Sequence, residues 1–168
     1  MKITLGSRSR ETVAVYFEKA ARPEIRAALP QKAKTLAEAL EDYERTLLPG
    51  AASFGRTILA DGQYVGDVWC YCMGQSEEPH GMVSYCVFEP GLWGQGIAGE
   101  ALGLFLTELE GRFPWMRTVG AFAYAANRAS VRVLGKNGFA LMERFVEDGV
   151  ESEYHQRALG SEKHTAEA

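Results

Sequence analysis

Cysteine, excess positive charge and long apolar runs are all scarce or missing in this sequence of 168 residues. Cys70, Cys72 and Cys86 form an odd set without metal-ligand spacing, which indicates neither a disulfide framework nor a zinc site. The formal net charge of −4 leaves no basic excess for binding nucleic acid. No apolar run reaches the ~20 residues of a membrane span, and residues 1–4 lack the apolar core of a signal peptide. We therefore expect a cytoplasmic protein without nucleic-acid or membrane partners.

The residues that are present have the composition of a globular protein, with 46% apolar and 24% charged residues. The length fits one domain, predicted over residues 1–159, and the polar tail over residues 160–168 is expected to be disordered. Apolar periodicity predicts helices over residues 11–21, 35–48, 97–112 and 129–137. Strands are predicted over residues 3–5, 54–59, 64–73, 82–88, 118–124, 139–146 and 150–158, with hairpin turns at Asp61-Gly62 and Asp148-Gly149.

Three glycines, Gly94, Gly96 and Gly99, lie between the strand predicted over residues 82–88 and the helix predicted over residues 97–112. Glycine permits positive φ and close approach of a ligand, and the unpaired first amides of a helix bind anions. Because Gly-Lys-Ser/Thr is absent, a Walker-type loop is excluded. A dinucleotide fingerprint belongs in the first strand–helix unit of a parallel sheet, whereas this turn follows a hairpin in mid-chain. The residues therefore predict a phosphate site of another kind.

Two motifs in the correct order resemble the GNAT superfamily of acyl-CoA N-acyltransferases. Residues 93–98, Trp-Gly-Gln-Gly-Ile-Ala, match its phosphate motif Gln/Arg-x-x-Gly-x-Gly/Ala. With tryptophan in its first position, the motif resembles that of the branch that contains ribosomal-protein N-terminal acetyltransferases. Residues 127–130, Asn-Arg-Ala-Ser, followed by Gly138-Phe139, resemble its second signature. The resemblance covers residues 54–158 well and residues 3–48 in outline. It implies an α+β fold with a mixed, mostly antiparallel central sheet, flanked by helices, in which one strand pair splays apart.

The resemblance also implies that the chain binds acetyl-CoA as cosubstrate and needs no metal. The turn amides would bind the pyrophosphate, and the end of the splayed strand would pair with pantetheine. Asn127 would hydrogen-bond a pantetheine amide, and Ser130 would be catalytic by hydrogen-bonding the departing thiolate. The implied cofactor-binding residues are Cys86, Val87, Phe88, Gly94, Gln95, Gly96, Ile97, Ala98, Gly99, Asn127 and Ser130. Many members carry a tyrosine four residues after the serine position, as general acid for the thiolate. This chain has Leu134 there. Either Ser130 or a water would then assist the thiolate, or the thiolate would leave without assistance.

Plainer structural roles are open for several of these residues. The glycines could form a simple helix-entry turn, Trp93 could be a core aromatic beneath it, and Asn127 could be a turn or cap residue. Ser130 could be an ordinary hydroxyl near a helix start. The general base that takes the proton of an amine is unassigned. Its candidates are Glu77, Glu78, His80, Tyr85, Glu89 and Glu143.

The function that the resemblance implies is transfer of acetyl from acetyl-CoA to a primary amine by direct attack in a ternary complex. A covalent acyl-enzyme is not indicated, because the sequence has no histidine near Cys86 to activate its thiol. The acceptor could be a protein N-terminus or a small amine such as an antibiotic, a polyamine or an amino-acid-like metabolite. A non-catalytic acyl-CoA-binding sensor or interaction module is the alternative, and acyl transfer to a hydroxyl is a third option. Because family members are often dimers, a homodimer is compatible with the resemblance.

Overall fold

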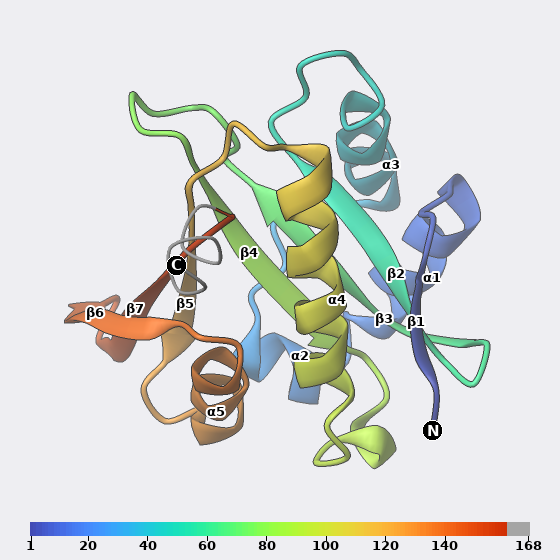
Figure 1. Ribbon diagram of the computed structural model, residues 1–168. Coiled ribbons are helices and arrows are strands. Elements are labelled where there is room, and N and C mark those ends of the chain that lie inside the picture. Colours follow the sequence, from blue (N-terminus) through green and yellow to red (C-terminus); the bar gives the residue numbers. More distant parts are fainter. Residues whose placement is uncertain (161–168) are drawn as a thin grey trace.

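The computed structural model describes residues 1–160 and is built on a seven-stranded sheet with the order β1-β2-β3-β4-β5-β7-β6 (Figure 1). The strands are β1 (Ile3–Gly6), β2 (Phe54–Ala60), β3 (Gln63–Tyr71), β4 (His80–Val87), β5 (Thr118–Tyr124), β6 (Ala140–Glu147) and β7 (Val150–Ala158). β4 and β5 pair in parallel, and every other neighbouring pair is antiparallel. The predicted mixed, mostly antiparallel sheet is confirmed. Of the predicted tail, residues 161–168 lie outside the described residues.

Both predicted hairpin turns are present, between β2 and β3 and between β6 and β7. Asp61 and Gly62 have φ of 49° and 81°, and Asp148 and Gly149 have φ of 50° and 78°. Two central residues with positive φ match the twist of the flanking antiparallel strands, which is why Asp-Gly is a strong hairpin pair.

Residues 1–160 contain six helical segments, and the longer ones flank the sheet (Figure 1). They are α1 (Arg10–Lys19), α2 (Pro23–Ala28), α3 (Leu36–Arg45), the 3₁₀ turn η1 (Pro90–Leu92), α4 (Ile97–Arg112) and α5 (Arg128–Lys136). Thr35 caps α3, because its side chain accepts from the N–H of Glu38. α3 ends at Arg45 rather than at the predicted residue 48, consistent with Pro49 disfavouring helical backbone in the residue before it. Among residues 1–160, no helix is both long and apolar enough to cross a membrane.

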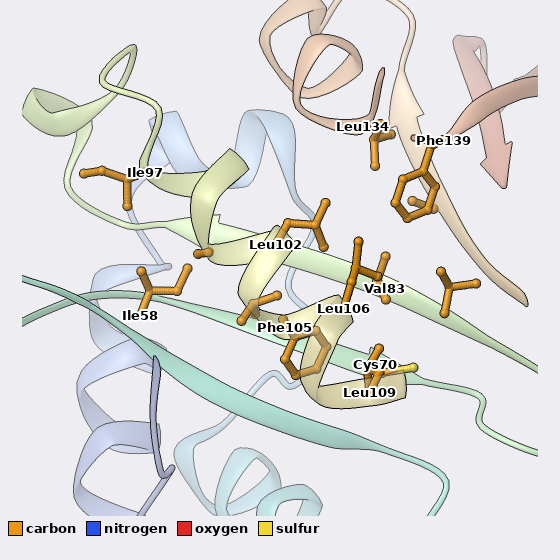
Figure 2. Close-up of a cluster of buried hydrophobic side chains, with 14 of the residues drawn as sticks. Ile58, Cys70, Val83, Ile97, Leu102, Phe105, Leu106, Leu109, Leu134 and Phe139 are labelled. Carbon is orange, nitrogen blue, oxygen red and sulfur yellow. The ribbon is translucent and has the colours of Figure 1, made fainter. Parts of the chain in front are cut away.

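The main core lies between the sheet and the helices α4 and α5. Figure 2 shows Leu102, Phe105 and Leu106 of α4 between this helix and the strands that carry Ile58 and Val83. Leu102, Phe105 and Leu106 are at most 1% exposed, so each contributes on the order of 2 kcal/mol by burial. This packing fixes the N-terminus of α4 at the end of β4.

The opposite face of the sheet is covered by α1 and α2, around a second cluster that includes Cys86 and Phe88. Phe88 packs edge-on against Tyr64 and Tyr16, with ring centroids 5.0 and 6.3 Å away. Side chains alternate across a strand, and accordingly Val83, Tyr85 and Val87 of β4 face α4 and α5, while Cys86 faces α1 and α2. Each face of β4 therefore belongs to a different layer.

Gly66 shows how tightly β3 lies against β4, since its partner in the register is Val87. A Cβ atom built on Gly66 would lie 2.1 Å from the carbonyl oxygen of Cys86, which is backbone and cannot move aside freely. A side chain at this position would push the end of β4 away from the sheet. β4 can therefore follow its course toward the glycine turn because residue 66 is glycine.

We expect Gly66→Ala to lower the free energy of unfolding by about 3 kcal/mol, because overpacking against backbone costs roughly that much. Urea unfolding followed by circular dichroism measures the loss. Gly111→Ala is the matched control, since a Cβ there meets no atom within 4 Å and Gly111 lies in α4. It should be neutral or stabilise the protein by up to about 1 kcal/mol. Equal stabilities of the two variants would contradict this account of the β3–β4 contact.

Candidate functional site

The glycine turn has a backbone conformation that requires glycine at two of its positions. Gly94 and Gly96 have φ of 83° and 80°, in the left-handed region. Gly96 is the N-cap of α4, and no side chain among residues 1–160 accepts a hydrogen bond from the first amides of the helix. The N–H groups of Ile97, Ala98 and Gly99 therefore combine free donors with the positive end of the helix dipole. This arrangement can bind a phosphate.

Trp93 connects the turn to the end of β4. Its indole Nε1 donates to the carbonyl oxygen of Val87 at 2.8 Å. The side chain is 48% exposed, so Trp93 is not the core aromatic that one sequence interpretation allowed. Because the indole holds the last residue of β4, the position of the turn depends on the position of the strand.

β4 and β5 separate close to this turn. They pair only at His80–Thr118, Gly81–Val119 and Met82–Gly120. Beyond these pairs, β4 continues alongside β3 as far as Val87, and β5 continues alongside β7 as far as Tyr124. The predicted splayed strand pair is therefore present, with a gap between the inner edges of the two strands.

The register of β3 and β4 decides which backbone groups face this gap. The N–H of Phe88 donates to the carbonyl oxygen of Val65 at 2.9 Å, so this pair belongs to the β3 side. Hydrogen-bonded and non-hydrogen-bonded pairs alternate in antiparallel strands. The backbone of Cys86 consequently faces β3, whereas the backbone groups of Tyr85 and Val87 face the gap. The carbonyl of Val87 is already occupied by Trp93, which leaves its N–H as a free donor toward β5.

A cavity of about 610 Å³ occupies the gap and reaches both faces of the sheet, since residues of α2, α4 and α5 all line it. Most of the predicted site residues lie in its wall, namely Cys86, Val87, Gly94, Gly96, Ile97, Ala98, Gly99, Asn127 and Ser130. Gln95 and Phe88 are not among the lining residues. Gln95 is exposed at the outside of the turn. Phe88 is buried in the α1–α2 layer, and its carbonyl accepts from Nη1 of Arg22 at 3.1 Å.

Asn127 and Ser130 meet at the start of α5. Oδ1 of Asn127 accepts from the N–H of Ser130 at 3.2 Å, so Asn127 is the N-cap of the helix as well as a cavity residue. The Ser130 hydroxyl lies 2.7 Å from the hydroxyl of Tyr85, which also donates to the Ser130 carbonyl at 3.3 Å. This Tyr85–Ser130 pair joins β4 to α5 across the cavity. Burial raises the pKa of Tyr85 to about 12, so its phenol is protonated and can donate at neutral pH.

Among the cavity residues that the sequence analysis did not single out are two cations of α5, Arg132 and Lys136. They are four residues apart in α5 and therefore lie on one side of the helix. The sequence does carry a signal for them, because two cations four residues apart follow Ser130 on the same predicted helix. Leu134, by contrast, is completely buried in the core. The position where many relatives carry a tyrosine is thus a packing position here.

The candidates for the general base are largely distant from the cavity. Among Glu77, Glu78, His80, Tyr85, Glu89 and Glu143, Tyr85 is the one that lines it. His80 lies where β4 and β5 still pair, with Nδ1 2.7 Å from Oγ1 of Thr118. Burial lowers the pKa of His80. Glu89 forms ion pairs with Lys19 and Arg22 at 3.3 Å.

A second cavity of about 780 Å³ lies on the α1–α3 side of the sheet. Trp69, Tyr71 and Ser84 line it from β3 and β4, and residues of α1 and α3 line it from above. Leu29 and Ser84 line both cavities, so the two spaces adjoin beside β4. Among residues 1–160, no group of three or more His, Cys, Asp or Glu side chains is placed to hold a metal ion.

Solved structures with the same fold are numerous. Aminoglycoside acetyltransferase AAC(6')-Ib in complex with coenzyme A has a TM-score of 0.79 at 17% identity, covering 98% of this chain and 99% of the other. Spermidine N-acetyltransferase from Vibrio cholerae, in complex with CoA and spermine, has a TM-score of 0.79 at 13% identity, covering 93% and 95%. The ribosomal L7/L12 alpha-N-protein acetyltransferase RimL, in complex with coenzyme A, has a TM-score of 0.77 at 18% identity, covering 95% of each chain.

Sequence comparison gives a family but no individual relative. No curated protein sequence matches this chain. The family model described as the acetyltransferase (GNAT) domain matches residues 4–140, which is most of the chain. The splayed strands, the glycine turn and the start of α5 all lie within this match. The chain therefore belongs to the GNAT acetyltransferase family.

Proposed function

We propose that this protein is an N-acetyltransferase that moves acetyl from acetyl-CoA to a primary amine by direct attack in a ternary complex. The observation that carries the proposal is the cavity through the sheet, which joins the N-terminus of α4 to the gap between β4 and β5. The structures of similar fold include acetyltransferases in complex with coenzyme A, and one in complex with CoA and spermine. Family membership favours the same cosubstrate in this chain.

The cofactor would lie along the cavity from the turn to the gap. The amides of Ile97, Ala98 and Gly99 would bind the pyrophosphate, because they are free donors at a helix N-terminus. Pantetheine would extend the sheet beside β4, pairing with the backbone groups of Tyr85 and Val87 that face the gap. The N–H of Val87 could also polarise the thioester carbonyl, whose oxygen gains negative charge when the amine attacks.

The Tyr85–Ser130 pair would assist the leaving group. The amine nitrogen would form a bond to the carbonyl carbon, the carbon–sulfur bond would break with its electron pair going to the CoA sulfur, and the proton lost by the nitrogen would balance the thiolate, giving the amide and free thiol. Ser130 would stabilise this thiolate with its hydroxyl proton. Tyr85, whose hydroxyl lies 2.7 Å from Oγ of Ser130, would act as a positioning residue by donating its phenol proton to that oxygen. Burial raises the pKa of the Cys86 thiol to about 11, and no histidine lines the cavity among the described residues. Direct transfer therefore fits better than an acyl-Cys86 intermediate.

Four more specific features of this protein stay predictions. The single domain over residues 1–159, the cytoplasmic location, the homodimer and the ribosomal-protein branch all rest on the sequence and its resemblance. The non-catalytic alternative is favoured by one observation, the buried Leu134 at the usual tyrosine position. Incubation with acetyl-CoA and a broad amine panel, followed by release of free thiol, separates enzyme from binding module. We expect thiol release with at least one amine, whereas tight CoA binding without thiol release would favour the binding module.

Gly96→Val should weaken binding of acetyl-CoA by about 100-fold or more, because a branched residue is strained at positive φ and its side chain would meet the pyrophosphate. Isothermal titration calorimetry measures the affinity. Gly91→Val is the matched control, since Gly91 lies in the same loop and a Cβ there meets no atom within 4 Å. Its affinity should be unchanged. Equal affinities of the two variants for acetyl-CoA would remove the turn from the cofactor site.

Ser130→Ala should lower kcat by about 10-fold with little change in KM for acetyl-CoA, since a hydrogen bond to the thiolate forms only as the bond breaks. Tyr85→Phe should lower kcat by a smaller factor, because Tyr85 acts through Ser130. In the Ser130→Ala background, Tyr85→Phe should have no further effect. Steady-state kinetics of the four proteins measures this coupling. Independent, additive effects, or an unchanged kcat for Ser130→Ala, would contradict the assigned roles.

Arg132→Gln and Lys136→Gln should each raise KM for acetyl-CoA by about 3- to 5-fold at low salt, the effect of one partly exposed ion pair with a phosphate. kcat should stay unchanged. The difference should shrink as salt increases, because exposed charges are screened. Arg128→Gln on the same helix is the control, since Arg128 is not a lining residue of the cavity. A similar rise in KM for Arg128→Gln would show a nonspecific effect of charge.

A further inference from the structure

The second cavity adjoins the proposed reaction site. Its boundary with the first cavity is formed by Leu29 and Ser84, which line both. Ser84 and Cys86 lie on the same side of β4, opposite to Tyr85. An amine held in the second cavity could therefore approach the thioester carbonyl from the face of the sheet opposite to α4 and α5. If the proposed acetyl transfer occurs, the chemistry of this cavity determines which amines are accepted.

Five aromatic residues line the second cavity. Trp69 and Tyr71 form part of its floor, and Tyr16 and Tyr43 project from α1 and α3. Tyr16 packs edge-on against Trp69, with ring centroids 6.0 Å apart. Phe17 lines the same space. Such walls favour a flat, apolar or aromatic body over a flexible, fully hydrated chain, because aromatic pairs add to the free energy of burial.

The charged residues of the second cavity are mainly cations. Arg8, Lys32 and Arg45 line it, against the single carboxylate Asp42. Arg45 is paired with Asp42 at 2.8 Å and with Glu41 at 3.0 Å, so these three charges compensate one another, whereas Lys32 has no ion pair within residues 1–160. Glu24 of α2 lines the first cavity and not the second. A ligand with several positive charges would therefore meet the unpaired Lys32 and no free carboxylate among the lining residues.

Arg8 is held in place with unused hydrogen-bonding capacity. Its Nη2 lies 3.4 Å from Oδ2 of Asp67, and Tyr43 donates to its backbone carbonyl at 3.2 Å. Its Nε has no hydrogen-bond partner in residues 1–160. Asp67 itself is only 1% exposed, accepts from the Tyr64 hydroxyl at 2.6 Å, and lines neither cavity. The guanidinium carries five N–H donors, and a carboxylate is the group that it binds best.

We propose that the second cavity is the acceptor pocket and that its acceptor is an aromatic amine carrying a carboxylate, as in an aromatic amino acid, rather than a polycation. The rings would bury the aromatic body, and Lys32 together with Arg8 would bind the carboxylate. The amine would then lie toward Ser84 and the thioester. This inference rests on the proposed function for the transfer step, but binding in the cavity can be measured without turnover.

The first experiment titrates L-phenylalanine, L-phenylalaninamide and spermidine into protein saturated with CoA, which cannot react. Calorimetry should show binding of L-phenylalanine at least about 10-fold tighter than binding of the amide, as expected for a lost charge-assisted hydrogen bond. Spermidine should bind more weakly than either. Tighter binding of spermidine, or equal binding of phenylalanine and its amide, would overturn the inference.

Charge-reversal variants test the direction of the electrostatics. Lys32→Glu should weaken binding of L-phenylalanine by about 5-fold or more while leaving binding of phenylalaninamide equal or tighter. Lys34→Glu is the matched control in the same loop, because Lys34 does not line the cavity. The double variant Arg8→Gln/Asp67→Asn removes the buried pair together, and it should also lose the preference for the carboxylate. Retention of that preference in both Lys32→Glu and the double variant would overturn the inference.

Thiol release with acetyl-CoA and the same amines separates this inference from the proposed function. Higher kcat/KM for L-phenylalanine than for spermidine and kanamycin supports both. Efficient acetylation of spermidine or kanamycin, with little acetylation of L-phenylalanine, would overturn the inference and leave the proposed function intact. Tight binding of L-phenylalanine with no thiol release from any amine would support the pocket and contradict the proposed enzyme.

Discussion

The separation of β4 from β5 after Met82 and Gly120 is the constraint on which the rest of the site depends. Each strand keeps its outer partner, β3 for β4 and β7 for β5, so both stay extended while their inner edges lose contact. Buried N–H and C=O groups need hydrogen-bond partners, and a gap with two unpaired edges is accordingly a place where an amide-containing chain can bind as an added strand. The cavity that crosses the sheet exists because of this gap.

The helices supply chemistry to the gap through their packing against the sheet. α4 buries one side in the core and thereby holds its free N-terminal amides beside the end of β4. α5 buries Leu134 in the same core, while Ser130, Arg132 and Lys136 line the cavity. The Tyr85–Ser130 hydrogen bond joins the strand to this helix. The same contacts that stabilise the fold thus position hydrogen-bond donors along the cavity.

Much of this arrangement is predictable from local patterns, and the failures share a physical cause. The Asp-Gly hairpins, the glycine turn and the cap at Asn127 depend on neighbouring residues, which sequence displays directly. Whether a β4 backbone group faces β3 or the gap depends on the pairing register, and shifting the register by one residue reverses the answer. The N–H of Phe88 therefore pairs with Val65 of β3, whereas the N–H of Val87 faces the gap. The Tyr85–Ser130 bond and the second cavity arise from residues distant in sequence, which periodicity does not bring together.

The central claim is that the gap between β4 and β5 binds the pantetheine arm of acetyl-CoA, with the pyrophosphate on the N-terminus of α4. A crystal structure of the protein with CoA tests it most directly. The account predicts phosphate oxygens within hydrogen-bond distance of the amides of Ile97, Ala98 and Gly99, and pantetheine beside the backbone of Tyr85 and Val87. CoA bound elsewhere, or β4 and β5 paired as far as Val87 with CoA present, would contradict it.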